Sequence, residues 1–100
     1  MPEYDKHAVK AAVKVSTVIG DLVGEPPVRR GRELLVCCPF HDDRHPSLRI
    51  NDEKNGGVWH CDPCGMGGDA FRFAMEHQGL AFADAVNFLG ERYQVERSRT

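Results

Sequence analysis

The sequence predicts a small α+β domain, in which an antiparallel β-sheet is flanked by one N-terminal helix and two C-terminal helices. Apolar residues recur at helical spacing near both ends of the chain. The middle contains short runs of β-type composition bounded by glycine and proline. It also contains two short pairs of potential metal ligands, Cys38 with His41 and Cys61 with Cys64. A chain of 100 residues buries a modest core, so we expect an additional cross-link.

The first helix is predicted over residues 5–22, followed by a linker that completes an N-terminal segment, residues 1–24. Its apolar positions follow one another at intervals of four and three, which places them on one helical face. They are Ala8, Ala12, Val15, Ile19 and Leu22. Gly24, Pro26 and Pro27 end this helix, because proline cannot continue it.

Three strands are predicted between this linker and the second pair of ligands. Leu34 to Val36 form an apolar run, and Ser47 to Asn51 alternate between polar and apolar residues. Val58 to His60 have β-type composition and lead directly into Cys61. The intervening residues 55–57 are Asn-Gly-Gly, which accept the positive φ angles of a hairpin turn.

Two helices are predicted after the second ligand pair. Asp69 is a good N-cap for a helix from Ala70 to about His77, which ends before Gly79. A last amphipathic helix is indicated by the spacing of Phe82, Ala85, Val86, Leu89 and Tyr93. Residues 25–96 therefore make up the main domain, and residues 97–100 are expected to form a frayed tail.

The ligand pairs follow the pattern Cys-x2-His, nineteen residues, Cys-x2-Cys. Two residues between ligands fit a tight turn, and the two turns together supply a tetrahedral Cys₃His set for one Zn²⁺. Cys38, His41, Cys61 and Cys64 are the predicted ligands. Because all four positions are filled by protein, the zinc is expected to be structural.

Other interpretations of these residues remain open. Cys61 and Cys64 would form a redox disulfide in a thioredoxin-like setting, but glycine and a hairpin surround them instead. A catalytic zinc requires an open position. Cys37 is an alternative to Cys38 as a ligand, although on a strand its side chain would point away from that of Cys38. His60 would likewise point away from the adjacent ligand Cys61. His7 and His77 lie on predicted helices and are expected to be solvated, and His45 precedes Pro46 in an extended loop.

Charge and hydropathy exclude several functional classes. The formal net charge is −2, so a nucleic-acid site would have to be a local basic patch. No segment approaches the ~20 apolar residues of a membrane span, and the N-terminus lacks the pattern of a signal peptide. We therefore expect a cytoplasmic protein, in which reduced thiols favour metal over disulfides.

Several motifs follow one another in a characteristic order. They are Arg30-Gly31-Arg32, Cys38-Pro39-Phe40-His41, Pro46-Ser47, Trp59-His60-Cys61, Cys64-Gly65 and Gly68-Asp69-Ala70-Phe71-Arg72-Phe73. This order resembles the N-terminal zinc-binding domain of bacterial and phage DnaG-type DNA primases over roughly residues 5–96. The resemblance implies a zinc ribbon that binds single-stranded DNA template and helps select the initiation site for primer synthesis. The implied partners are a primase polymerase domain or a replicative helicase, and no catalytic residues are implied in this chain.

The resemblance also suggests which residues contact nucleic acid. The candidates, which could supply cations for phosphates and a ring for bases, are Arg32, Arg44, Arg49, Lys54 and Trp59. The alternative for Trp59 is a core ring packed over the zinc site, and the alternative for the arginines is simple solvation. The chain departs from the family pattern at Leu34, Leu48, Asp62-Pro63 and Ala81, where it has fewer aromatic rings, an extra acid and no hydroxyl cap.

Two other functions remain possible on the sequence alone. The first is a free-standing adaptor whose ribbon and helices bind and modulate a replication protein, a helicase or primase. The second is a general zinc ribbon that binds RNA or another partner. The net negative charge favours an adaptor, whereas the family motifs favour a primase module.

Overall fold

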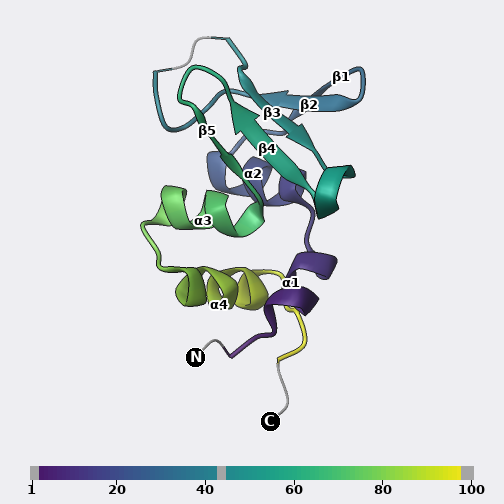
Figure 1. Ribbon diagram of the computed structural model, residues 1–100, viewed down its shortest axis with the longest axis vertical. Coiled ribbons are helices and arrows are strands. Elements are labelled where there is room, and N and C mark those ends of the chain that lie inside the picture. The colour runs from purple at the N-terminus through teal and green to yellow at the C-terminus, as the bar shows by residue number, and fades with distance from the viewer. Residues whose placement is uncertain (1–2, 43–44, 98–100) are drawn as a thin grey trace.

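The computed structural model describes residues 3–42 and 45–97 (Figure 1). Arg44 and residues 98–100 of the predicted tail lie outside this range. The elements, in order, are α1 (Lys6–Ala12), α2 (Val15–Val23), β1 (Val28–Arg30), β2 (Glu33–Val36), β3 (Leu48–Asn51), a 3₁₀ turn (Lys54–Gly56), β4 (Val58–Cys61), β5 (Met66–Gly68), α3 (Ala70–Gln78) and α4 (Phe82–Arg92).

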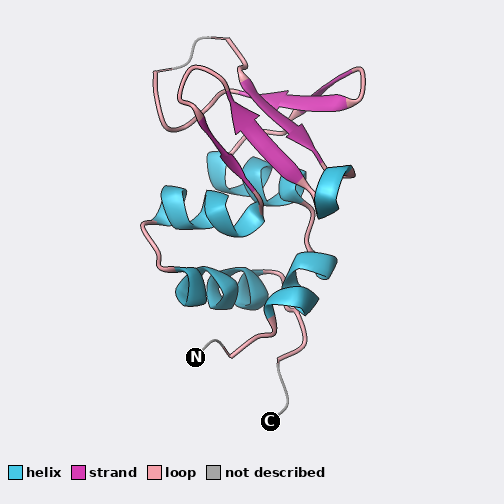
Figure 2. Cartoon of the chain, in the orientation of Figure 1, coloured by secondary structure: helices cyan, strands magenta, loops and turns pink. Residues whose placement is uncertain are grey.

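The molecule is elongated, with extents of 45 × 26 × 21 Å. The described strands form one antiparallel sheet in the order β1-β2-β3-β4-β5. The sheet occupies one end of the molecule, with α2 and α3 beside it and α4 and α1 at the other end (Figure 2). Both termini lie at this helical end (Figure 1). The predicted zinc-ribbon fold class, an antiparallel sheet with flanking helices, is confirmed.

Strand register separates two faces of the sheet. Leu48 and Ile50 on β3 are fully buried, and they pair with Cys61 and Trp59 on β4, which are also buried. Arg49 lies between them on the opposite face, where it pairs with His60. Because successive side chains alternate across a strand, one face packs on the helices and the other carries polar groups.

The N-terminal helix is the main error of the sequence prediction. Two helices replace it, because Val13 and Lys14 take extended conformations with ψ of 141° and 138°. The buried positions in this region are Val9, Val13, Val15, Val18 and Ile19, whereas Ala8 and Ala12 are exposed. Helix α1 packs on α4, and α2 packs on β3 and α3, so the break lets two short helices bury valines against different partners.

The break leaves α2 without a local cap. Lys14 occupies the N-cap position and makes no side-chain hydrogen bond there. Instead, Asp52 after β3 accepts hydrogen bonds from the backbone N–H of Ser16 at 2.9 Å and from its hydroxyl at 2.5 Å. A residue of the β3–β4 connection therefore caps the second helix and holds it against that connection.

The remaining differences from prediction are small. β1 and β5 were not predicted, whereas the three predicted strands are present. Asp69 caps α3 as expected, accepting a hydrogen bond from the backbone N–H of Arg72 at 2.9 Å. Ala81 precedes α4 with no side-chain cap. None of the helices in the described part of the chain has the length and apolar character needed to cross a bilayer.

Candidate metal centre and its surroundings

Two turns deliver the four candidate ligands to one end of the sheet. The first turn follows β2 and carries Cys38 and His41, and the second connects β4 to β5 and carries Cys61 and Cys64. The second turn is closed by Gly65, whose backbone N–H donates to the carbonyl of Cys61 at 2.9 Å. Gly65 has a φ of 68°, a conformation that glycine adopts without a side-chain penalty.

The ligand atoms lie close enough to share one ion. All four are within 4.8 Å of one another. The Cys38 and Cys64 sulfurs are 3.5 Å apart, and His41 Nδ1 lies 2.7 Å from the Cys64 sulfur and 4.0 Å from that of Cys61. Sulfurs bound tetrahedrally at ~2.3 Å from zinc would be roughly 3.8 Å apart. The arrangement therefore fits Zn²⁺ after adjustments of about an ångström.

The chemistry of the donors points to the same ion. Three thiolates and one imidazole are the ligands of structural zinc sites, and four protein ligands leave no open position for water or substrate. Cys38 and Cys61 are buried, and Cys64 and His41 are half-buried. The predicted ligand set is thus positioned to bind one zinc ion.

The surroundings of the two buried thiols affect their pKa values in opposite directions. Burial raises the pKa of Cys38 to about 12. Burial also acts to raise the pKa of Cys61, but hydrogen bonds from the Cys64 backbone and from the Ser47 hydroxyl outweigh it and lower the pKa. In the metal-free protein Cys38 therefore keeps its proton at neutral pH, and zinc must displace that proton on binding.

An aromatic cluster connects the metal centre to the helices. Phe40, between Cys38 and His41, contacts the rings of Trp59 and Phe73 at centroid distances of 5.8 and 5.4 Å. The indole N–H of Trp59 donates to the carbonyl of Asp69 at 2.8 Å, at the start of α3. His77 is half-buried and stacks on Phe73 with a centroid distance of 5.5 Å, so its ring extends the cluster toward the surface.

Comparisons with known proteins identify this centre. The chain matches the CHC2 zinc finger family over residues 2–100. It belongs to this family. It is 42% identical over 78 residues to the DNA primase of Neisseria meningitidis and 36% identical over 98 residues to that of Geobacillus stearothermophilus. These alignments cover 76% and 98% of this chain but 13% and 16% of the primases, so the chain spans a small part of their length.

A solved structure agrees with the family assignment. The crystal structure of the zinc-binding and RNA polymerase domains of Aquifex aeolicus primase aligns with a TM-score of 0.79 and 26% sequence identity. The alignment covers 93% of this chain and 22% of that one. The resemblance inferred from the motifs is therefore confirmed, and the chain is homologous to the N-terminal region of bacterial DNA primases.

Two residues that directly precede ligands, Cys37 and His60, do not belong to the CHC2 centre, as the alternation of side chains along an extended segment predicted. Cys38, and not the adjacent Cys37, belongs to the ligand group. The backbone N–H of Cys37 donates to Glu25 at 3.3 Å. His60 precedes a ligand but is exposed on the polar face of the sheet.

The four described nucleic-acid candidates do not form one patch. Arg49 and Lys54 line a hollow of about 610 Å³ on the polar face of the sheet. Trp59 also borders this hollow, although its register places it on the opposite, buried face. Arg32 lines a different hollow, of about 470 Å³, beside the β1–β2 turn. The two hollows share Asn51. Arg44 lies outside the described residues.

Trp59 is 2% exposed, so its ring is not available to stack on a base. The core-packing alternative describes this residue, and its ring forms part of the cluster over the zinc site. Sequence reasoning also missed three groups beside the hollows, namely Lys14, Arg29 and His60. The pairing of His60 with Arg49 was the available signal for one of them, because directly opposite residues share a face.

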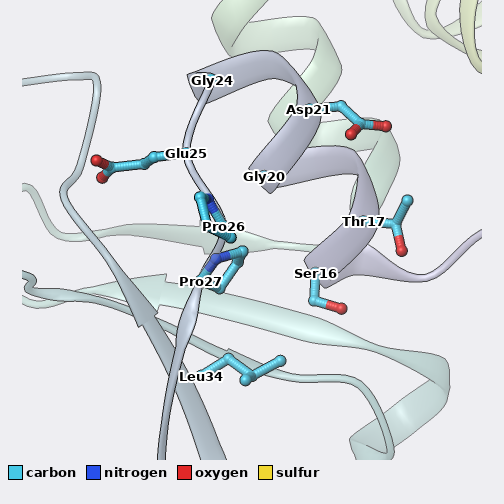
Figure 3. A pocket seen from close by; sticks show the side chains of 9 residues that line it. All are labelled: Ser16, Thr17, Gly20, Asp21, Gly24, Glu25, Pro26, Pro27 and Leu34. Carbon is cyan, nitrogen blue, oxygen red and sulfur yellow. The ribbon is translucent and has the colours of Figure 1, made fainter.

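A third hollow, of about 660 Å³, lies between α2 and the segment that leads into β1 (Figure 3). Pro26 and Pro27 lie beside the helix. Asp21 extends from the helix on one side, and Glu25 extends from the segment after the helix on the other. Two carboxylates and no lysine or arginine line this hollow. Its charge therefore disfavours phosphate and sets it apart from the other two.

Proposed function

We propose that this chain is the zinc-binding module of a DNA primase, which binds single-stranded DNA template and helps select the site of RNA primer synthesis. The observation that carries the proposal is the closed Cys₃His centre within a fold that aligns with the primase of A. aeolicus at a TM-score of 0.79. The proposed setting is the cytoplasm, and the proposed partners are a primase polymerase domain or a replicative helicase.

The zinc centre has no chemical step in this proposal. Its ligand sphere is complete, so the metal stabilises the two turns and holds β4 in place. Catalysis of primer synthesis is assigned to another domain. The contribution of this chain is recognition, through the surface beside the metal.

The polar face of the sheet is the proposed contact surface. Arg49 and Lys54 line its hollow together with His60 and Asn51, and these four side chains supply hydrogen-bond donors for a DNA backbone. Glu33 and Asp62 line the same hollow and balance the charge of the two cations. Arg32, Lys14 and Arg29 line the second hollow, which meets this surface at Asn51, although the register places Arg29 on the same face as Ile50. With Trp59 buried, phosphate contacts rather than base stacking account for the affinity, which should consequently fall steeply with salt.

A binding titration tests the proposal. Zinc-loaded protein is titrated into a labelled single strand, and fluorescence anisotropy is recorded at low and at physiological salt. We expect saturable binding that weakens with salt, and weaker binding by Lys54→Ala and Arg32→Ala variants. Absence of binding at low salt would refute a template role, and an unchanged affinity in both variants would refute this surface.

A second candidate function is an adaptor that binds a basic segment of a replication protein. The hollow of Figure 3 favours it, because Asp21 and Glu25 line it together with Gly20, Pro27 and Leu34 and no lysine or arginine is among its lining residues. Substitution of both acids by their amides would abolish such binding without changing the affinity for DNA. A pull-down with purified helicase and primase polymerase domain distinguishes this function from template binding.

A further inference from the structure

Three side chains converge beside the second zinc turn, on the polar face of the sheet. One guanidinium nitrogen of Arg49, Nη2, donates to both carboxylate oxygens of Asp62, at 3.2 and 3.0 Å. His60 Nε2 lies 2.9 Å from Oδ1 of the same carboxylate. Arg49 and His60 are direct register partners on β3 and β4. A single carboxylate is therefore held by two donors that the sheet places side by side.

The two donors are positioned by the sheet, whereas the acid is not. Gly67 on β5 lies opposite His60, and a Cβ atom at Gly67 would come within 2.9 Å of His60 Nδ1. The bare backbone of Gly67 thus makes room for the imidazole. The Arg49 Nε is buried and has no hydrogen-bond partner among the described residues, so the inner part of this side chain is enclosed. Asp62 sits on a turn with its side chain 66% exposed.

A guanidinium and an imidazole N–H directed at one anion form a phosphate-binding arrangement, because both donate to negatively charged oxygens. We propose that Arg49 and His60 form a subsite for one phosphodiester of the DNA backbone, and that Asp62 occupies this subsite until DNA displaces it. The inference rests on the proposed template function, and it adds that Asp62 lowers the affinity of the chain for DNA. Asp62 competes with the template for the same donors.

The sign of the effect follows from this competition. DNA must break the contacts of Asp62 before its phosphate reaches Arg49, and the carboxylate then remains near the bound phosphate. Exposed ion pairs are weak, so removing the competitor strengthens binding by roughly two- to five-fold. If Asp62 instead served to orient Arg49 for DNA, its removal would weaken binding.

The experiment compares four forms of the zinc-loaded chain by anisotropy with a labelled oligothymidylate. They are the parent, Asp62→Asn, Arg49→Met and the double variant. Glu33→Gln is the matched control, because Glu33 lines the same hollow and the substitution removes the same charge. Zinc content and melting temperature confirm that each variant is folded, and Asp62→Ser repeats the test if D62N loses its zinc.

We expect D62N to bind about two- to five-fold more tightly and E33Q to change affinity by less. In the Arg49→Met background, D62N should lose most of its gain, because the contested donor is absent. Equal gains from D62N and E33Q would show only a general charge effect and overturn the inference. Unchanged or weaker binding by D62N would overturn it as well.

A second readout separates this inference from the proposed function. Inorganic phosphate is titrated into the parent and D62N proteins, and the side-chain NMR signals of Arg49 and His60 are followed. If no form binds DNA but phosphate shifts both signals more strongly in D62N, the subsite stands and the template function fails. If phosphate shifts neither signal in D62N, the subsite is refuted whatever the DNA titration shows.

Discussion

Removal of the zinc ion should unfold the sheet, and the sequence provides a direct reporter of that event. Trp59 is the one tryptophan of the chain, and it is 2% exposed in the folded structure. Its ring packs against Phe40, which lies between two ligands on the first zinc turn. Loss of the metal frees this turn, removes Phe40 from the cluster and admits water to the indole.

The expected magnitude is large relative to the stability of the domain. Binding of a structural zinc contributes apparent free energies of ~10–16 kcal/mol, and small domains are stable by only ~5–15 kcal/mol in total. Phe40 also makes ring contacts with Trp59, Phe73 and His77 at 5.8, 5.4 and 6.5 Å. At roughly 0.5–1.5 kcal/mol for each of the three aromatic contacts, releasing the turn costs about 1.5–4.5 kcal/mol through these contacts alone.

Chelation followed by tryptophan fluorescence and circular dichroism measures this effect. We expect the emission to shift to the red and the β-sheet signal to be lost. Cys38→Ser should reproduce the result without a chelator, whereas Cys37→Ser, at the adjacent position, should retain one zinc per chain. Unchanged emission, dichroism and melting temperature after complete metal removal would refute the reasoning.

Two further predictions concern contacts that join distant parts of the chain. Asp52→Ala should lower the free energy of unfolding in urea by about 1–2 kcal/mol, because Ser16 loses its capping partner. The neighbouring substitution Glu53→Gln should have little effect. Equal losses of stability in the two variants would show that capping is not the cause. Burial and the hydrogen bond to Asp21 raise the pKa of Tyr93 to about 12, above the ordinary value near 10, so the neutral phenol is favoured in the folded state. The parent should lose stability relative to Tyr93→Phe as the pH rises from about 10 to 12, and parallel melting curves over this interval would contradict that assignment.

The metal ligands were predictable because their signal is local. Each pair is separated by two residues, and a tight turn brings both side chains of a pair to one centre. Alternation distinguished Cys37 from Cys38, although β2 ends at Val36. Val36 and Cys38 are buried and Cys37 is half-buried, so the alternation continues past the end of the strand. Helix α3 was equally accessible, because Asp69 is an N-cap and Gly79 adopts the positive φ that ends the helix.

The N-terminal region was not predictable from a single helical period. The prediction used Ala8 and Ala12 as core positions, whereas the structure buries Val9 and Val13 instead. If only the larger side chains had been used, Val9 and Val13 would have defined one helical face and Val15 a different one. That change of face would have indicated a break between Val13 and Val15. The break itself depends on tertiary contacts, because only packing on two different partners makes an extended Val13 favourable.

β5 was missed for a related reason. Its sequence, Met-Gly-Gly, has low β-propensity, and glycine weakens an isolated strand. The structure requires this composition, because a Cβ atom at Gly67 would approach the carbonyl of Trp59 to 2.8 Å. The close approach of two backbones, rather than any preference of the strand itself, selects the residue.

The electrostatics of the CHC2 centre determine what the metal can contribute to recognition. Three thiolates and one Zn²⁺ carry a net charge of about −1, which repels a DNA backbone. Under the proposed template function, the attraction comes from residues such as Arg49 and His60, whose alignment depends on the pairing of β3 with β4. Cys61 ends β4 directly after His60, so a bound zinc would fix the strand that holds one of the two donors. We therefore expect a zinc-free chain to lose the proposed affinity for DNA although no cationic side chain has been removed, because the metal would act by holding the donors in register rather than by charge.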